Sequence, residues 1–327
     1  MQIVIQVVIL IVGFVLLIKG ADWFVEGAAG IAEKFGIPHI VIGLTIVAIG
    51  TSLPEASVSI ASALKGSGAI TIGNVLGSNI LNVLLILGIT SLICKIPVDK
   101  MTMKVEMPFL IGVTALLAIL GLQDNVISLV EGAILLGLMA LYLAYLGWRS
   151  RFEEEIHELV DEEVGRPEVE VEEEADDKKP LTLPKMILFI LLGIVMITVG
   201  SDKTVDAATA IATILGVDER IIGLTIVAFG TSLPELVTSI TAATKGNTAI
   251  AIGNIVGSNI FNILFVVGIT AVITPVEYNA SFLIDSIIAI VTVLLLMACV
   301  LPKKNLNRIT GAIMLAVFVV YYAILII

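Results

Sequence analysis

Residues 42–55 read IGLTIVAIGTSLPE, an apolar run that ends in a proline and a glutamate. The same pattern returns as IGLTIVAFGTSLPE at residues 222–235, a shift of 180 positions. AITIGNVLGSNILN at residues 69–82 returns at that same shift, as AIAIGNIVGSNIFN at residues 249–262. Because two motifs repeat with one spacing, the simplest explanation is a duplication without insertion. The sequence therefore predicts two related halves.

The composition predicts that both halves lie in a membrane. Hydrophobic residues make up 58% of the 327 positions and charged residues 14%, whereas a soluble domain has about 25% charged residues. A helix that crosses a bilayer needs about 20 apolar residues. We therefore predict an all-α integral membrane protein with ten transmembrane helices, in the apolar stretches at about residues 3–18, 40–64, 70–93, 108–122, 127–148, 183–199, 221–244, 250–273, 282–301 and 309–327. The first and sixth stretches can extend to residues 32 and 215.

The ten spans divide into two groups of five. We expect a first five-helix repeat at residues 1–148, an acidic linker at residues 149–183 and a second five-helix repeat at residues 184–327. Since equivalent helices are five spans apart, and five is odd, the second repeat is predicted to be inverted relative to the first. Inverted repeats are typical of secondary transporters, whose substrate site lies near the bilayer midplane between the two copies.

The charges predict how the chain is oriented. Lys and Arg gather in one set of loops, which by the positive-inside rule places both termini outside and the linker in the cytoplasm. The linker holds 14 of the 29 acidic residues, lacks EF-hand spacing and is expected to be a solvated tether that is partly helical at about residues 152–159. The net charge of −11 argues against a nucleic-acid partner. The first segment lacks the basic region and cleavage site of a signal peptide, so we expect it to remain in the mature protein.

Glu55 and Glu235 end the first pair of repeated motifs, near the middle of the second and seventh predicted spans. An ionisable side chain at that depth costs about 2.5–3.5 kcal/mol on insertion scales, so it usually faces the protein interior and marks an ion or proton path. The alternative is a structural carboxylate satisfied by hydrogen bonds between helices. The oxygen-bearing neighbours of both glutamates favour the ion path.

Each glutamate belongs to a strip of oxygen donors on one helical face. Ala48, Thr51, Ser52 and Glu55 follow the i, i+3, i+4, i+7 pattern, and the second half supplies Ala228, Thr231, Ser232 and Glu235. Pro54 and Pro234 lack an N–H and displace the carbonyl four residues earlier, which frees backbone oxygens beside the strips. In hydrocarbon those carbonyls need a partner, and a bound cation, a hydroxyl or an ordered water can be one.

The second pair of repeated motifs adds amide and hydroxyl oxygens. Asn74, Ser78 and Asn82 are spaced by four residues and share one face, as do Asn254, Ser258 and Asn262. Gly73 and Gly77, with Gly253 and Gly257, form patterns of small residues that let helices approach closely. Asn79 and Asn259 point about 100° away, so we expect them to make hydrogen bonds between helices and not to bind the ion.

Together these residues predict a site for a hard cation. It offers carboxylates, hydroxyls and amide oxygens, while Cys94 and Cys299 have no metal or disulfide spacing. Ca²⁺ accepts six to eight oxygens in flexible geometry, whereas Mg²⁺ requires stricter order. Two carboxylates neutralise one Ca²⁺ or two Na⁺, and competition for them is a physical basis for exchange. When the site is empty its charge is uncompensated, so we expect the unloaded protein to resist moving the site from one side of the membrane to the other.

On these residues the chain resembles the Ca²⁺:cation antiporter superfamily, and specifically its sodium/calcium exchanger branch. The GTSLPE and GNxxGSNxxN segments of both halves are similar to the α-repeats of that family. The resemblance implies ten helices, a site formed by spans two, three, seven and eight, and movement of spans one and six for alternating access. It also implies electrogenic exchange of three Na⁺ for one Ca²⁺. Since the chain has no large regulatory domain, it resembles the prokaryotic members, which implies the cell membrane as its location.

The resemblance also implies which residues bind the ions. Many exchangers carry Asp at the position of Asn262, so this site is less anionic, and its stoichiometry and K⁺ dependence stay open. Carried over by motif position, the metal ligands are shared carboxylates, backbone carbonyls, hydroxyls and central amides, namely Glu55, Glu235, Thr51, Thr231, Ala48, Ala228, Ser52, Ser232, Ser78, Ser258, Asn82 and Asn262.

Other functions are weighed against Na⁺/Ca²⁺ antiport. An H⁺/Ca²⁺ antiporter could use the same two glutamates. An intramembrane hydrolase lacks support because HExxH and GxSxG motifs are absent, and we expect no enzyme activity, no cofactor and no obligate protein partner. A passive channel usually has rings of residues around an axis, whereas one duplication predicts a single central site. The repeat-matched acids Asp22, Glu26, Asp202 and Asp206 are expected either at water-facing entrances or as ordinary helix-end carboxylates.

Overall fold

The computed structural model describes residues 2–65, 68–164, 181–216 and 228–326, and it is almost entirely helical. In the first half the elements are α1 (Gln2–Phe35), α2 (His39–Ile42), η1 (Gly43–Val47), α3 (Ala48–Thr51), α4 (Leu53–Leu64), α5 (Ala69–Leu81), η2 (Asn82–Ile86), α6 (Leu87–Ile93), β1 (Ile96–Pro97), η3 (Thr102–Glu106), α7 (Met107–Asp124), β2 (Val126–Ile127) and α8 (Leu129–Val164), where η marks a π-helical turn. In the second half they are α9 (Leu183–Ile214), α11 (Ala228–Gly230), α12 (Leu233–Thr244), α13 (Thr248–Phe261), η5 (Asn262–Val267), α14 (Gly268–Ile273), β3 (Val276–Glu277), α15 (Phe282–Val300), β4 (Asn305–Leu306) and α16 (Arg308–Ile326).

The helices have the length and apolarity of membrane spans. In the described ranges seven helical segments are long and apolar enough to cross a bilayer, and the bent pair formed by residues 39–51 and 53–64 makes an eighth. The apolar part of α16 is shorter, at residues 308–324. Large apolar side chains are exposed along α1, α9, α15 and α16, as expected for helices that face lipid. The all-α membrane architecture is confirmed, and the count of ten spans stays a prediction.

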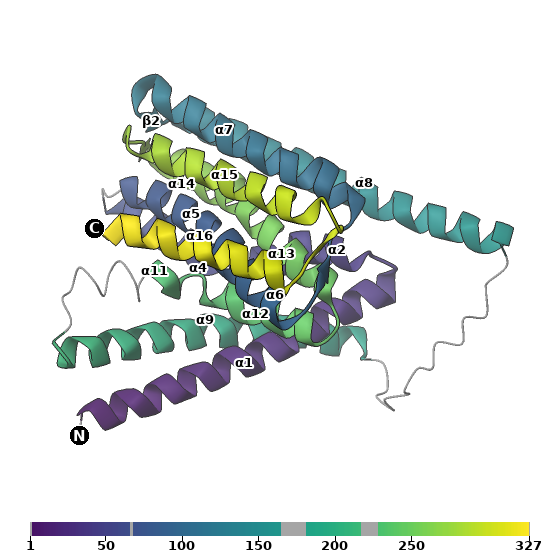
Figure 1. Cartoon of the computed structure of the whole chain (residues 1–327), viewed down its shortest axis with the longest axis horizontal. Helices are drawn as coiled ribbons and strands as arrows, with labels where there is room; N and C mark the ends of the chain where they lie inside the picture. Colours follow the sequence, from purple (N-terminus) through teal and green to yellow (C-terminus); the bar gives the residue numbers. More distant parts are fainter. Residues whose placement is uncertain (1, 66–67, 165–180, 217–227, 327) are drawn as a thin grey trace.

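Elements of the two halves correspond at the shift of 180 positions. α4 corresponds to α12, η2 to η5, and β1 to β3. The short strands pair across the halves, because β1 is antiparallel to β4 and β2 is antiparallel to β3. Exchanging the two halves turns one of these ribbons into the other. In Figure 1 the ribbons lie at opposite ends of the bundle. This is the pairing that two halves related by a twofold axis produce.

Two details differ from the sequence-based expectations. The second predicted span is not one helix with a kink, since α3 ends at Thr51 and α4 starts at Leu53 with a bend of 44°. The fifth span does not end at residue 148 either, because α8 continues as one helix to Val164. This helix includes the helical part of the linker expected at residues 152–159 and extends beyond it. Residues 165–180 of the predicted linker lie outside the described residues.

Helices α1 and α9 form a closely packed pair along one side of the molecule (Figure 1). Their contact consists of glycines seven residues apart, Gly13 and Gly20 on α1 facing Gly193 and Gly200 on α9. A methyl group at Gly20 would come within 2.8 Å of Met196 Cβ, and one at Gly200 within 2.8 Å of the Gly13 carbonyl oxygen. Small residues allow this approach in lipid, where apolar burial gives no drive for helix association.

We predict that Gly20→Ala destabilises the protein by about 1–3 kcal/mol, because the new methyl group overpacks against backbone atoms of α9. The matched control is Gly137→Ala on α8, where no described atom lies within 4 Å of the added methyl group. Alanine is the better helix former by about 1 kcal/mol, so the control is neutral or stabilising. Thermal unfolding in detergent measures both, and equal midpoints for the two variants would contradict the packing argument.

Candidate ion-binding site

The break between α3 and α4 positions the first glutamate. Ser52 leaves the helical conformation with φ −87° and ψ 7°, and Pro54 occupies the first turn of α4. Ser232 has nearly the same angles, φ −90° and ψ 4°, just before α12. The prolines therefore begin new helices, because a residue without an N–H fits the first turn. Glu55 and Glu235 both lie in such a first turn, where the helix dipole favours a negative charge.

The two carboxyl groups are both buried in the interior of the bundle. Glu55 and Glu235 are each 0% exposed, and Ser52, three residues before Glu55, contacts the carboxyl group of Glu235. Neither oxygen of Glu55 has a hydrogen-bond partner, and of Glu235 only Oε1 has one, the Ser52 hydroxyl at 3.0 Å. In the described part of the chain no Lys, Arg or His forms an ion pair with either group. Buried charge without compensation is strongly unfavourable, so this pair requires a cation or a proton.

Hydroxyl and amide oxygens of the repeated motifs contact one another across the two halves. The Thr51 hydroxyl donates to Asn254 Oδ1 at 3.0 Å and lies 3.4 Å from the Ser258 hydroxyl. The Ser258 hydroxyl lies 3.4 Å from the Ala48 carbonyl oxygen. The Ser232 hydroxyl lies 3.4 Å from that of Ser78. Each of these contacts joins one half to the other, so the oxygens predicted from separate motifs are brought to a common place.

The remaining predicted residues divide into three cases. Thr231 keeps a buried hydroxyl oxygen without a hydrogen-bond partner. Ala228 begins α11, and only its backbone is described. Asn82 and Asn262 are fully buried, and their Oδ1 atoms have no hydrogen-bond partner. As expected, Asn79 and Asn259 instead make hydrogen bonds between helices.

Ser59 and Ser239 are site residues that the sequence analysis missed. The Ser59 hydroxyl accepts from Asn74 Nδ2 at 3.1 Å, and the Ser239 hydroxyl accepts from Asn254 Nδ2 at 3.0 Å. Both serines are fully buried, one helical turn beyond the glutamates. That i+4 spacing was the available signal. By engaging the amide nitrogens, the serines leave the amide oxygens directed elsewhere, and Asn254 Oδ1 accordingly faces Thr51.

The acids predicted at the entrances lie apart from the buried pair. Asp22 on α1 is 3.3 Å from Lys245, which follows α12, and 3.7 Å from Lys19. The residues at the same positions of the repeat, Asp202 and Lys65, are both described and form no ion pair with each other. Glu26 lines a pocket of about 1260 Å³ beside Lys245. The contact at Asp22 is therefore made at one end of the molecule only.

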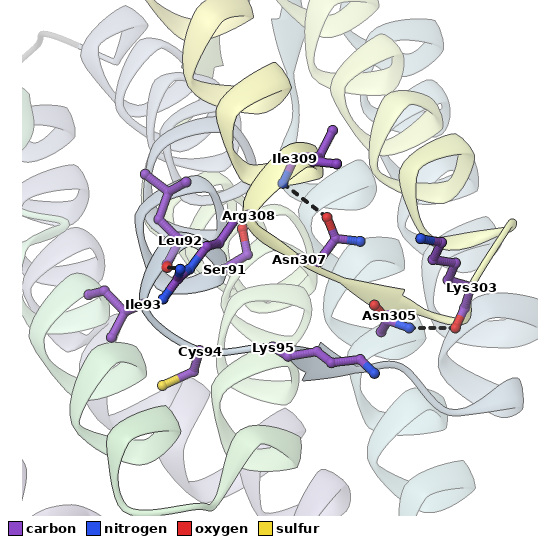
Figure 2. A pocket seen from close by; sticks show the side chains of 10 residues that line it. All are labelled: Ser91, Leu92, Ile93, Cys94, Lys95, Lys303, Asn305, Asn307, Arg308 and Ile309. Carbon is purple, nitrogen blue, oxygen red and sulfur yellow. Dashed lines mark hydrogen bonds between the residues drawn. The ribbon is translucent and has the colours of Figure 1, made fainter.

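A separate pocket lies where α6 ends and α16 begins, and Figure 2 shows its lining side chains. Its volume is about 560 Å³. Lys95, Lys303 and Arg308 contribute three positive charges, and none of the residues that line it is acidic. It therefore cannot serve as a cation site. No cluster of three or more His, Cys, Asp or Glu suited to a metal exists among the described residues either, so the Glu55–Glu235 pair is the candidate.

An apolar helical bundle with two related halves and buried carboxylates without a basic partner defines a membrane protein of the transporter class. The chain belongs to the sodium/calcium exchanger protein family, whose model matches residues 5–148 and 185–327. This is a family of transporters and not of enzymes. The two matched segments leave out most of the predicted linker.

Relatives and solved structures agree with the family assignment. The sodium/calcium exchanger MaX1 of Methanosarcina acetivorans is 30% identical, with 99% of each chain covered. The inner membrane protein YrbG of Escherichia coli is 35% identical, with 97% of this chain and 95% of that protein covered. A structure of the sodium-calcium exchanger NCX_Mj soaked with Na⁺ and Ca²⁺ superposes with a TM-score of 0.80 at 29% identity, covering 98% of both chains.

Loss of one buried charge gives a prediction for stability. We expect Glu55→Gln to raise the unfolding midpoint in cation-free buffer, because it removes the repulsion between two buried carboxylates. At a Ca²⁺ site the unaltered protein is expected to gain about 2.7 kcal/mol of stability at 100 times the dissociation constant, and the variant is expected to lose that gain. Thermal unfolding with and without Ca²⁺ measures both effects. The control is Glu33→Gln at an exposed position of α1, and a Glu55→Gln variant that Ca²⁺ stabilises as before would contradict the site.

Proposed function

We propose that this protein is a secondary active antiporter that exchanges Na⁺ for Ca²⁺ across a membrane. The observation that carries the proposal is the pair of fully buried carboxylates, Glu55 and Glu235, with three of their four oxygens unpartnered. Hard oxygen ligands select hard cations, and flexible sets of them suit Ca²⁺. The names of MaX1 and of the NCX_Mj structure, both sodium/calcium exchangers, support the choice of ions.

The proposed ligands are the oxygens gathered around the glutamates. They are the twelve residues that the sequence analysis carried over, Ala48, Thr51, Ser52, Glu55, Ser78, Asn82, Ala228, Thr231, Ser232, Glu235, Ser258 and Asn262. The two carboxylates match the charge of one Ca²⁺ or of two Na⁺. The site is electrically neutral with either one Ca²⁺ or two Na⁺ bound, and it is charged when empty. Because the empty state is unfavourable, binding of one ion is coupled to release of the other.

We propose that the halves are inverted repeats of five spans and that the site opens to each side in turn. The ribbons that pair across the halves at opposite ends of the bundle support the inversion. The α1–α9 pair, joined by glycine contacts, is suited to move as one unit against the other helices. The proposed location is the cell membrane, with both termini outside and the acidic linker in the cytoplasm. Neither a cofactor nor an obligate protein partner is part of the proposal.

Transport in sealed vesicles tests the coupling ion. With the purified protein in Na⁺-loaded vesicles, Ca²⁺ uptake is expected to follow an outward Na⁺ gradient and to stop when that gradient is dissipated. Glu235→Gln should reduce uptake to the level of protein-free vesicles, because half of the charge that neutralises Ca²⁺ is lost. Glu33→Gln, which changes an exposed carboxylate, should keep the full rate.

The second candidate is H⁺/Ca²⁺ antiport at the same two glutamates. It is favoured by one observation, that the buried carboxylates have no cationic neighbour and so also provide sites for protons. The same vesicles distinguish the two functions. If a pH gradient alone drives Ca²⁺ uptake when Na⁺ is absent from both sides, the coupling ion is H⁺ and not Na⁺.

A further inference from the structure

Four asparagine side chains form a closed network where the two halves meet. Asn79 Nδ2 donates to the backbone oxygen of Asn259 at 3.0 Å, and Asn259 Nδ2 donates to the backbone oxygen of Asn79 at 3.0 Å. Asn82 Nδ2 donates to Asn259 Oδ1 at 2.9 Å, and Asn262 Nδ2 donates to Asn79 Oδ1 at 3.2 Å. The contacts follow the symmetry of the repeat, because each hydrogen bond has an equivalent in which the two halves have exchanged places. All four side chains are at most 3% exposed.

The network determines how each amide is oriented. A backbone carbonyl can only accept a hydrogen bond, so the amide nitrogens of Asn79 and Asn259 must face it. Their Oδ1 atoms then face the next asparagine and can only accept. Asn82 and Asn262 therefore present their nitrogens to the network, and their own Oδ1 atoms are left over. Those two oxygens are buried and have no hydrogen-bond partner.

We propose that Asn79 and Asn259 are positioning residues that hold the Oδ1 atoms of Asn82 and Asn262 as ligands for the transported cation. This rests on the proposed function. Asn82 and Asn262 lie one turn beyond Ser78 and Ser258, on the face that carries the hydroxyls near the glutamates. The two ends of an amide have nearly the same shape but opposite polarity, so a rotation of 180° would present N–H groups to the cation. The hydrogen bonds from Asn82 and Asn262 prevent that rotation.

Each positioning residue acts across the interface between the halves. Asn259 in the second half orients Asn82 in the first, and Asn79 orients Asn262. The network also explains why an amide suits position 262 in this chain. A carboxylate there has no hydrogen to donate to Asn79 Oδ1, so two acceptors would face each other in a buried place. The amide network thus keeps the number of carboxylates in the site at two.

A double-mutant cycle tests this by Ca²⁺ titration calorimetry of the full-length protein in detergent. Asn259→Ala is expected to weaken Ca²⁺ binding about tenfold, within the range that directly coupled residues show. In an Asn82→Ala background the same change should add less than about twofold, since the residue through which it acts is gone. In an Asn262→Ala background the full effect should persist, because Asn262 is held by Asn79. Equal effects in the two backgrounds, or unchanged affinity, would overturn the positioning role.

Controls separate positioning from general destabilisation. Thr90→Val removes another fully buried hydrogen bond, from the Thr90 hydroxyl to the Ile86 carbonyl at 2.7 Å, outside the network. It should lower the unfolding midpoint without changing Ca²⁺ affinity. If Asn259→Ala does not fold, Asn79→Ala gives the corresponding cycle, in which the Asn262→Ala background removes the effect and the Asn82→Ala background keeps it.

The readout also separates this inference from the proposed function. Ca²⁺ binding does not depend on which ion drives transport, so an H⁺-coupled protein leaves the expected cycle unchanged. An unaltered protein that does not bind Ca²⁺ overturns the proposed function and the positioning role together. An unaltered protein that binds Ca²⁺, combined with a cycle that shows no selectivity between the backgrounds, overturns the positioning role alone.

Discussion

Repulsion between two buried carboxylates is the constraint on which the rest of the structure depends. Glu55 and Glu235 come from different halves, and no basic side chain in the described residues pairs with them. In a low-dielectric interior two such charges are tolerated only when a bound cation or a proton neutralises them. The serine and threonine hydroxyls around them add oxygens without adding fixed charge. The site thus lacks fixed positive charge, which a bound cation supplies in the proposed function.

Close packing makes that assembly possible. A methyl group at Gly253 would come within 2.8 Å of the Ile40 carbonyl oxygen, and one at Gly257 within 2.7 Å of Leu44 Cα. These glycines bring α13 against α2 and η1, and so bring Asn254 and Ser258 to Thr51. The polar cross-links between the halves therefore depend on residues that have no side chain. In lipid, where packing and hydrogen bonds replace the hydrophobic drive, the two contributions act together.

Much of this arrangement could be predicted from the sequence because each motif occurs twice, so residues kept in both copies stand out from the apolar background. The repeat identified the two glutamates, the helical faces on which they lie and the asparagines that lie near them. Hydropathy showed where apolar segments lie but not whether they are continuous, which is why the break at Ser52 was not anticipated. A helix was expected at residues 152–159 of the linker, but not that it would continue α8 without a break to Val164. Part of the second copy of the first motif, residues 222–227, lies outside the described residues.

The pairings within the site could not be predicted for a different reason. Which amide donates to which oxygen depends on rotamers and on contacts between residues some 180 positions apart, as for Asn79 and Asn259. Ser59 and Ser239 were missed because a serine one turn from a glutamate is common on any helix. The spacing of Asn79 did predict bonding between helices, since its direction from the ion-facing strip follows from helical geometry alone.

The ion pair between Lys245 and Asp22 shows that equal sequences need not make equal contacts. Lys65 and Asp202 occupy the matching positions of the other half, yet no such pair joins them. A conformer in which the halves trade roles would exchange one attachment for its twin and preserve the inventory of interactions. In the alternating access proposed above, the loss of one contact would therefore be offset by the gain of the other. The duplication supplies the residues for such an exchange at both ends of the molecule.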